Sequence, residues 1–318
     1  FHIEPQILAA RELCEASFAD RVFFCNSGAE ANEAAIKLAR KYGNERLGGR
    51  YEIVTLLNSF HGRTLATVTA TGQERFHAGF APLPAGFRYA PYDDVDALDA
   101  AITDRTCAVL VEPIQGEGGI RIPGLSYLRD VRALCDRHGI LLALDEVQTG
   151  VGRTGTFFAY EQAGIRPDIV TLAKALGNGF PVGALLATED AAQAFDPGSH
   201  ASTFGGNPLA MAAVLAVLET IRSDNLLEHC RRMGEYFLGK LRALKEKHPL
   251  IRDVRGRGLL VGCELDGDGS RHVAACLKKG LIINCTNGNV LRFVPPLIVT
   301  KADIDRAVEI LDDVLGGA

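Results

Sequence analysis

The sequence lacks an excess of basic residues, a long apolar run and a paired-cysteine motif, and each absence excludes a class of protein. Its 34 lysines and arginines against 39 aspartates and glutamates give a net charge of −5, so the basic surface of a nucleic-acid-binding protein is missing. No apolar run approaches the roughly 18 to 20 residues of a membrane-spanning helix. The longest, such as Ile140–Leu144 and Ala184–Ala187, have the length of buried strands.

The eight cysteines form no C-x-x-C pair, which argues against a zinc ribbon or a thioredoxin-type centre, and we expect no metal site. Several lie in apolar runs, as Cys25 and Cys107 do, where a free thiol packs like a small hydrophobic side chain. Free thiols fit a reducing compartment, so we expect a cytoplasmic protein. No signal peptide is recognisable. Because the sequence begins at Phe1 rather than Met, we expect it to be part of a longer chain.

Short apolar runs alternate with longer amphipathic stretches, which is typical of a mainly parallel sheet with helices on both faces. The length of 318 residues suggests about two domains. Helices are indicated at 31–38 by the apolar spacing and at 125–138, where Gly139 would end the helix. Strands are predicted at 22–25, 53–57, 65–70, 107–111, 140–144, 169–172 and 182–187.

The pattern changes after Asn207, where helical stretches are followed by short apolar runs and a last helix. The predicted helices are 208–221, 225–247 and 302–315, and the predicted strands are 258–264, 281–284 and 290–293. We therefore predict an α/β fold with a large domain at residues 1–223 and a smaller C-terminal α+β domain at residues 224–318.

Polar segments follow several predicted strands, and ligands of open α/β sheets bind beyond the carboxyl ends of the strands. The first segment, Asn26–Glu30, contains the S-x-x-E pattern of a helix capping box. Its small residues Gly28 and Ala29 leave backbone N–H groups open to an anion at the helix start. The capping and anion-binding interpretations are compatible.

Two charged residues directly follow apolar runs. Asp145 is costly to bury unless a cationic group pairs with it, although aspartate is also a common helix N-cap. Gln148 adds a second hydrogen-bonding group three positions on. Lys174 follows another run, where desolvation would favour the neutral amine that a Schiff-base lysine requires. The alternative for Lys174 is a side chain that extends into solvent.

Two further loops are compatible with ligand binding. Phe60, His61 and Arg63 surround a glycine and could stack on a planar ring and hold an anion, or form an ordinary surface loop. The segment 202–208 offers hydroxyl groups for a phosphate, although alone it indicates a turn. Together the segments supply an anion site, a stacking face, an acid, a hydrogen-bond donor and an amine. A phosphorylated aromatic aldehyde requires all five.

These segments resemble the class III aminotransferases, which use pyridoxal 5′-phosphate on a fold of type I, and within them the acetylornithine/succinylornithine group. The resemblance covers the length of the chain and is carried by residues 24–33, 60–64, 111–118, 144–155, 173–177, 202–208 and 291–296. It implies transfer of the terminal amino group of N-acetylornithine to 2-oxoglutarate, giving glutamate, in arginine biosynthesis. Family members usually carry roughly 70 further residues before position 1, which complete the small domain and part of the substrate site.

The resemblance also implies a role for each matching residue, with Asp145 and Lys174 as the catalytic ones. The implied cofactor contacts are Ser27, Gly28 and Ala29 to the phosphate, Phe60 stacked on the ring, Asp145 at the ring nitrogen, Gln148 at the ring hydroxyl, and Lys174 as the point of covalent attachment. Thr203 would bind the phosphate of the neighbouring subunit, which implies a homodimer. Arg63 would hold a substrate carboxylate. Glu117 and Arg292 would form a pair that opens when glutamate brings a second carboxylate.

Three alternatives remain open from the residues alone. The amino donor could be succinylornithine or ornithine, because the acyl group does not follow from these residues. The fold could perform another pyridoxal phosphate reaction, such as decarboxylation or mutase chemistry, although Glu117 and Arg292 favour a transaminase that uses glutamate. The chain could also be a non-catalytic fragment that keeps the fold as an interaction scaffold.

Overall fold

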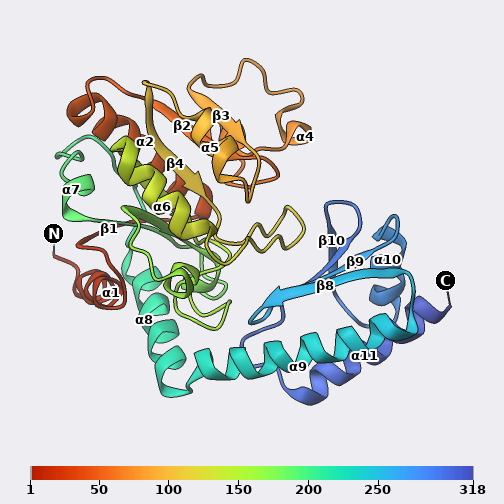
Figure 1. Cartoon of the computed structure of the whole chain (residues 1–318). Coiled ribbons are helices and arrows are strands. Elements are labelled where there is room, and N and C mark those ends of the chain that lie inside the picture. Colours follow the sequence, from red (N-terminus) through yellow and green to blue (C-terminus); the bar gives the residue numbers. More distant parts are fainter. Residues whose placement is uncertain (1, 318) are drawn as a thin grey trace. The chain divides into compact units, whose positions relative to one another are not determined.

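The computed structural model describes residues 2–317, and its contacts divide the chain into two units (Figure 1). The first unit contains the residues up to Pro113, Pro123–Val151 and Phe158–Thr220. The second contains Ile114–Ile122, Gly152–Phe157 and the residues from Ile221 on. Two short segments thus leave the first unit and pack with the C-terminal one.

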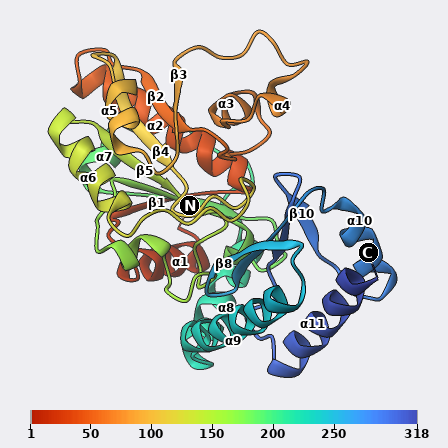
Figure 2. The same cartoon turned by 45° about the vertical axis from the view of Figure 1, so that its right-hand side comes forward.

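The first unit is built on a seven-stranded sheet flanked by helices (Figures 1 and 2), in the order β1-β7-β6-β5-β4-β2-β3. Its strands are β1 (Arg21–Cys25), β2 (Glu52–Leu56), β3 (Phe87–Ala90), β4 (Thr106–Val111), β5 (Leu141–Asp145), β6 (Ile169–Leu172) and β7 (Gly183–Ala187). Strand β7 is antiparallel to both β6 and β1, and the other pairs are parallel. The predicted α/β fold with a mainly parallel sheet is confirmed.

The helices of the first unit pack on this sheet through small apolar side chains. They are α1 (Glu4–Glu15), α2 (Gly28–Arg46), α3 (Leu65–Ala70), α4 (Glu74–His77), α5 (Val95–Ala101), α6 (Tyr127–His138), α7 (Glu189–Ala192), and the 3-10 turns η1 (Ala159–Ala163) and η2 (Lys174–Leu176). In α2, Ala34, Ala35 and Leu38 are buried against sheet residues. Gly139 ends α6 with a left-handed φ of 62°, as its position predicted.

The strand predicted at 65–70 is wrong, because Leu65–Ala70 forms helix α3. Threonine hydroxyl groups explain the difference, since they can bond within a helical turn as well as in a strand. The Oγ1 of Thr69 donates to the carbonyl of Leu65 at 2.6 Å, and the Oγ1 of Thr67 accepts from the N–H of Thr64 at 3.1 Å. The pattern also did not indicate β3.

The C-terminal unit contains a four-stranded antiparallel sheet in the order β10-β11-β9-β8. Its strands are β8 (Ile251–Arg257), β9 (Leu260–Leu265), β10 (Asn284–Thr286) and β11 (Val290–Phe293). Its helices are α9 (Leu226–Lys247), α10 (Ser270–Lys278) and α11 (Lys301–Gly316), and α8 (Pro208–Ser223) leads into it. Phe237 of α9 and Phe293 of β11 meet edge to face in its core, with ring centroids 5.2 Å apart.

The strand predicted at 281–284 begins only at Asn284. The N–H of Leu281 instead donates to the carbonyl of Cys276 at 2.9 Å, and the N–H of Gly280 to that of Leu277 at 3.0 Å. These bonds close the C-terminal end of helix α10. The N–H groups of Gly280 and Leu281 therefore bond to the helix and not to a strand of the sheet.

A membrane-spanning helix, a metal-binding cluster and paired cysteines are all absent from residues 2–317. None of their helices is long and apolar enough to cross a membrane, and no three His, Cys, Asp or Glu side chains gather where they could hold a metal ion. All eight cysteines are free. Burial raises the pKa of Cys25 and of Cys107 to about 12, so both remain thiols near neutral pH.

Candidate active site

Loops that follow several strands of the large sheet touch one another. A Cβ placed on Gly28 would lie 2.7 Å from Cγ1 of Val147 and 3.5 Å from Cβ of Ala173. A Cβ on Gly62 would lie 2.9 Å from Cβ of Ala29. Because only glycine allows such close approach, the sequence at these two positions serves the convergence of the loops. The polar segments 26–30, 58–64 and 145–150 thus lie together, next to Ala173, the residue before Lys174.

Helix α2 begins at this junction and is capped by Ser27. The Ser27 Oγ accepts from the N–H of Glu30 at 3.2 Å, and the Glu30 carboxylate reaches back to the N–H of Asn26 at 2.7 Å. The predicted capping box is therefore present with its return bond displaced by one residue. The N–H groups of Gly28 and Ala29 lie in the first turn of a 19-residue helix, whose positive end favours an anion.

Asp145, the last residue of β5, is 4% exposed and accepts three hydrogen bonds. Its Oδ2 accepts from Nδ2 of Asn32 at 2.7 Å and from Nδ1 of His61 at 2.8 Å. Its Oδ1 accepts from the N–H of Val147 at 3.0 Å. These donors compensate the loss of water around the carboxylate. The bond to Val147 closes a turn, and because no helix begins between β5 and η1, the alternative that Asp145 is a helix N-cap is wrong.

The partners of Asp145 are themselves positioned. Asn32 accepts from Oγ1 of Thr171 at 2.8 Å and donates to the carbonyl of His61 at 2.8 Å. The N–H of His61 donates to Oγ1 of Thr71 at 2.9 Å. The Nε2 of His61 is buried without a hydrogen-bond partner within residues 2–317. One network therefore joins α2, β5, β6 and the loop after β2, and it holds the carboxylate in one orientation.

The sequence pattern did not single out Asn32, Thr171 and Glu112. Asn32 lies among alanines on the buried face of α2, and a polar residue on an apolar face was the available signal. Glu112 follows the apolar strand β4 and accepts from the N–H of Phe60 at 3.0 Å. Its place directly after a strand was the same signal that pointed to Asp145.

Lys174 opens η2 with a left-handed φ of 45°, which is uncommon for a residue other than glycine. The residue is exposed, so the expectation that burial would desolvate its amine is wrong. The reason is the turn itself, because strand β6 ends at Leu172 and Lys174 is exposed between the buried residues Ala173 and Leu176. Thr171, three positions earlier, pairs with Asp145 between β6 and β5.

Aromatic and cationic side chains gather in the loop after β2. The ring of Phe60 meets that of Phe76 edge to face, with centroids 5.6 Å apart. The guanidinium of Arg63 lies 5.4 Å from the centroid of Phe60 and 4.4 Å from that of Phe76. The charge expected to hold a substrate carboxylate thus lies beside the ring expected to stack on a cofactor. Gln148 is half-buried in the turn after Asp145.

Thr203 is exposed on a loop that lies next to the start of α2. The side chain of Asn26 donates to Oγ of Ser202 at 3.2 Å, and a Cβ on Gly205 would lie 2.2 Å from the carbonyl oxygen of Phe24. This loop and the residues at the end of β1 line a pocket of about 370 Å³. Thr203 is therefore accessible from outside the chain.

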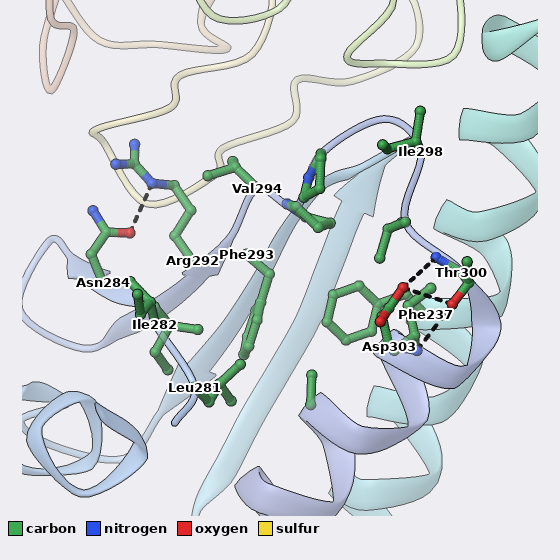
Figure 3. Close-up of a pocket in the computed structure, with 16 residues that line it drawn as sticks. Phe237, Leu281, Ile282, Asn284, Arg292, Phe293, Val294, Ile298, Thr300 and Asp303 are labelled. Atoms are coloured by element: carbon green, nitrogen blue, oxygen red, sulfur yellow. Dashed lines mark hydrogen bonds between the residues drawn. The ribbon is translucent and has the colours of Figure 1, made fainter. Parts of the chain in front are cut away.

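Within the C-terminal unit, Arg292 of β11 forms an ion pair with Glu117 of the segment Ile114–Ile122. The Nη1–Oε1 distance is 2.7 Å, and the two side chains are 10% and 31% exposed. The Nε of Arg292 donates to Oδ1 of Asn284 at 3.1 Å, beside an apolar pocket of about 870 Å³ (Figure 3). The two residues expected to form a switchable pair are thus in contact, and their switching stays a prediction.

Glu146, next to Asp145, is a buried carboxylate to which the sequence pattern assigned no role. It accepts from Oγ1 of Thr149 at 2.7 Å and from the N–H groups of Ala159 and Tyr160, each at 2.9 Å. Burial raises its pKa from 4.5 to about 7 in spite of these bonds. Glu146 therefore joins the turn after β5 to the start of η1 through a group that titrates near neutrality.

We predict that Glu146→Gln flattens the pH dependence of stability. Because the folded pKa of about 7 exceeds the unfolded value near 4.5, stability present at low pH is lost as the pH rises through 7. A pKa difference of about 2.5 corresponds to about 3 kcal/mol. Unfolding free energies from denaturant titrations between about pH 5 and about pH 8 measure this slope. Equal slopes in the wild type, the variant and an exposed control, Glu246→Gln, would contradict the assignment.

The sequence matches the family model described as Aminotransferase class-III over residues 1–315. The chain belongs to this family. It is 57% identical over 314 residues to the acetylornithine aminotransferase of Caldanaerobacter subterraneus subsp. tengcongensis, which covers 98% of the chain and 80% of the relative. It is 51% identical to the acetylornithine aminotransferase of Methanocaldococcus jannaschii, over 99% of the chain and 79% of the relative.

Solved structures agree with this family assignment. The ornithine aminotransferase from Toxoplasma gondii superposes with a TM-score of 0.95 at 35% identity, over 100% of this chain and 76% of its own. A Bacillus anthracis aminotransferase gives a TM-score of 0.93 at 33% identity, over 100% and 81%. The predicted membership of the class III family and the transferase fold are confirmed, and the chain is an aminotransferase. The non-catalytic alternative gains no support.

Proposed function

We propose that the chain transfers the terminal amino group of N-acetylornithine to 2-oxoglutarate, giving the semialdehyde and glutamate, as a step of arginine biosynthesis. The identities of 51–57% to acetylornithine aminotransferases support this choice of donor. The observation that carries the chemistry is the buried Asp145 carboxylate at the end of β5, which accepts hydrogen bonds from three donors, one of them Asn32 of α2.

The residues around Asp145 and at the start of α2 fit pyridoxal 5′-phosphate. Ser27 caps α2, and the backbone N–H groups of Gly28 and Ala29 lie in its first turn, where a helix favours a phosphate group. The proposed contacts are Ser27, Gly28, Ala29 and a partner's Thr203 to the phosphate, Phe60 to the ring face, Asp145 to the ring nitrogen, Gln148 to the ring hydroxyl, and Lys174 to the aldehyde carbon. When bound, the group supplies a ring that withdraws electrons from the reacting substrate carbon.

The residues of the chain supply orientation and proton transfer. Asn32 and His61 donate to Oδ2 of Asp145, and these bonds would orient the carboxylate toward a protonated ring nitrogen. The Nζ of Lys174 would take the proton from the substrate carbon as a base and deliver it as an acid to the carbon of the cofactor that carried the aldehyde. The exposed position of Lys174 leaves the amine accessible to the incoming substrate.

The two substrates differ in their carboxylates, and Arg63, Glu117 and Arg292 match this difference. N-acetylornithine brings one carboxylate, for which Arg63 is the proposed partner. Glutamate and 2-oxoglutarate bring two, and the second would displace Glu117 and bind the planar guanidinium of Arg292. While Glu117 is paired, the charge of Arg292 is neutralised, which suits the donor with a neutral acyl group.

We also propose a cytoplasmic homodimer, in which Thr203 completes the phosphate site of the partner subunit. The exposure of Thr203 next to the start of α2 supports this arrangement. We assign residues 1–223 to the large cofactor-binding domain and residues 224–318 to the small domain. The change of unit near residue 220 supports that boundary.

Steady-state rates with three amino donors test the proposed reaction. With 2-oxoglutarate as acceptor, we expect kcat/KM for N-acetylornithine to exceed that for N-succinylornithine and ornithine by at least about tenfold, or about 1.4 kcal/mol. A higher value for either of the others would replace the donor. Absence of glutamate formation with all three, from enzyme saturated with pyridoxal phosphate, would refute the function.

A further inference from the structure

The segment Ile114–Ile122, which carries Glu117, lies on the sheet of the C-terminal unit. The backbones of Gln115 and Arg121 exchange two hydrogen bonds of 3.1 Å, which close the base of the segment. Ile114 and Ile120 are buried with Leu260 of β9. The base of the segment is therefore fixed by its own backbone and by apolar packing.

At the tip of the segment, the Nε of Arg121 donates to the carbonyl oxygen of Gly118 at 3.2 Å, on the N-terminal side of Gly119. Glu117 is surrounded by Gly116, Gly118 and Gly119, and glycine loses more conformational freedom on ordering than other residues. Gly119 has a φ of 102°, which other residues rarely adopt. A glycine-rich tip needs contacts from outside the segment if it is to hold the Glu117 carboxylate at one place.

Arg255 of β8 supplies such contacts. Its Nε donates to the carbonyl oxygens of Gly119 at 3.1 Å and Ile120 at 3.0 Å, and its Nη2 donates to that of Gly119 at 2.7 Å. These carbonyl groups follow Glu117 by two and three residues. Arg255 therefore fixes the backbone on the C-terminal side of Glu117.

Two carboxylates hold Arg255 in turn. Its Nη1 donates to Oδ2 of Asp253 at 2.8 Å and to Oε2 of Glu264 at 2.6 Å, and its side chain is 22% exposed. The guanidinium thus connects two acids of the sheet with two carbonyl groups of the segment. Arg255 binds the carbonyl groups through Nε and Nη2 and the carboxylates through Nη1. A lysine ammonium has no planar group with several nitrogen donors and cannot reproduce this arrangement.

We propose that Arg255 is a positioning residue for the Glu117–Arg292 pair and thereby sets the choice between monocarboxylate donors and dicarboxylates. The inference rests on the proposed role of that pair in the aminotransferase reaction. When Arg255 holds the tip, Glu117 neutralises Arg292 and the site accepts the acylated donor. Without Arg255, the tip moves, and Arg292 stays free to bind glutamate or 2-oxoglutarate.

The test compares Arg255→Met with Arg252→Met. Arg252 lies on the same strand and pairs with Asp266 at an exposed position, so its loss is the matched control. In Arg255→Met we expect kcat/KM for N-acetylornithine to fall by about tenfold, while that for 2-oxoglutarate changes by less than about threefold. Arg255→Lys should restore only part of the donor value. Equal losses for both substrates would overturn the proposal.

A double variant separates action through Glu117 from a general structural role. If Arg255 acts by placing Glu117, adding Arg255→Met to Glu117→Gln should change donor kcat/KM by less than about twofold. Additive losses would overturn the proposal. The Arg252→Met control should be additive with near-zero effect in both backgrounds.

Hydrogen–deuterium exchange provides a readout that does not depend on turnover. Peptides covering Ile114–Ile122 in the full chain should exchange faster in Arg255→Met than in the wild type and in Arg252→Met. Unchanged exchange would overturn the proposal even if activity falls. If the wild type transaminates none of the donors, the proposed function fails, while the exchange result still decides whether Arg255 holds the segment.

Discussion

Replacing Lys174 with alanine is expected to lower kcat by at least about 10⁴-fold while the protein remains folded. In the proposed mechanism, this variant loses both the amine that attaches the cofactor and the base that moves the substrate proton. The fold should survive because Lys174 is exposed in the short turn η2 and lies outside the buried strand β6 that precedes it.

Three measurements on Lys174→Ala check this result. Steady-state assays with N-acetylornithine and 2-oxoglutarate measure the rate, and thermal unfolding measures the fold. Borohydride reduction followed by peptide mass analysis should label Lys174 in the wild type and no lysine in the variant. Lys278→Ala, an exposed position in α10, is the control and should behave as the wild type. A normal rate in Lys174→Ala would refute the mechanism.

The sheet of the large unit could be predicted from sequence because its strands are nearly unbroken apolar runs. Strand β5 begins directly after Ile140, and its first four residues are apolar. Strand β6 has the same bounds as the strand predicted at 169–172. Such runs are typical of strands that are buried on both faces, so few polar residues interrupt their apolar pattern. Strand β8 was missed for the opposite reason, because its charged residues, such as Arg252 and Asp253, break the pattern.

Two wrong predictions, a strand at 65–70 and a buried Lys174, concern residues that are compatible with more than one local structure. The residues Leu65–Ala70 combine apolar and threonine side chains, and short runs of this kind do not separate a strand from a buried helix. Lys174 follows a buried strand, but whether a side chain stays buried depends on the turn after the strand. Lys174 has a left-handed φ of 45° and opens the turn η2, and the sequence pattern did not indicate this turn.

The charged residues of the candidate site could be predicted from the sequence, but the hydrogen bonds that position them could not. Carboxylate and amine at strand ends indicated Asp145 and Lys174, because charged residues there need a partner or a function. The bonds of Asn32 to Asp145 and to Thr171 join residues 113 and 139 positions apart. Contacts of that separation depend on how helix α2 packs on the sheet, which no local pattern fixes.

Asp145→Asn is expected to lower kcat by about 10³-fold, because a neutral amide cannot stabilise a protonated ring nitrogen. The substitution should also destabilise the fold by about 1–3 kcal/mol, since a buried donor loses its acceptor. Both oxygens of Asp145 accept bonds, and an amide offers only one oxygen. The amide nitrogen must therefore face the N–H of Val147, or the donors of Asn32 and His61.

The two effects of Asp145→Asn can be separated by a control carboxylate outside the site. Asp136 of α6 pairs with Arg132 at an exposed position, so Asp136→Asn should leave kcat unchanged and stability nearly so. The kinetic loss in Asp145→Asn should persist at temperatures well below the unfolding transition, where the variant is fully folded. If Asp145→Asn lost stability but kept its rate, the carboxylate would act only as a cap for the turn at Val147. The electronic role assigned to Asp145 would then be wrong, and the ring nitrogen would need another partner.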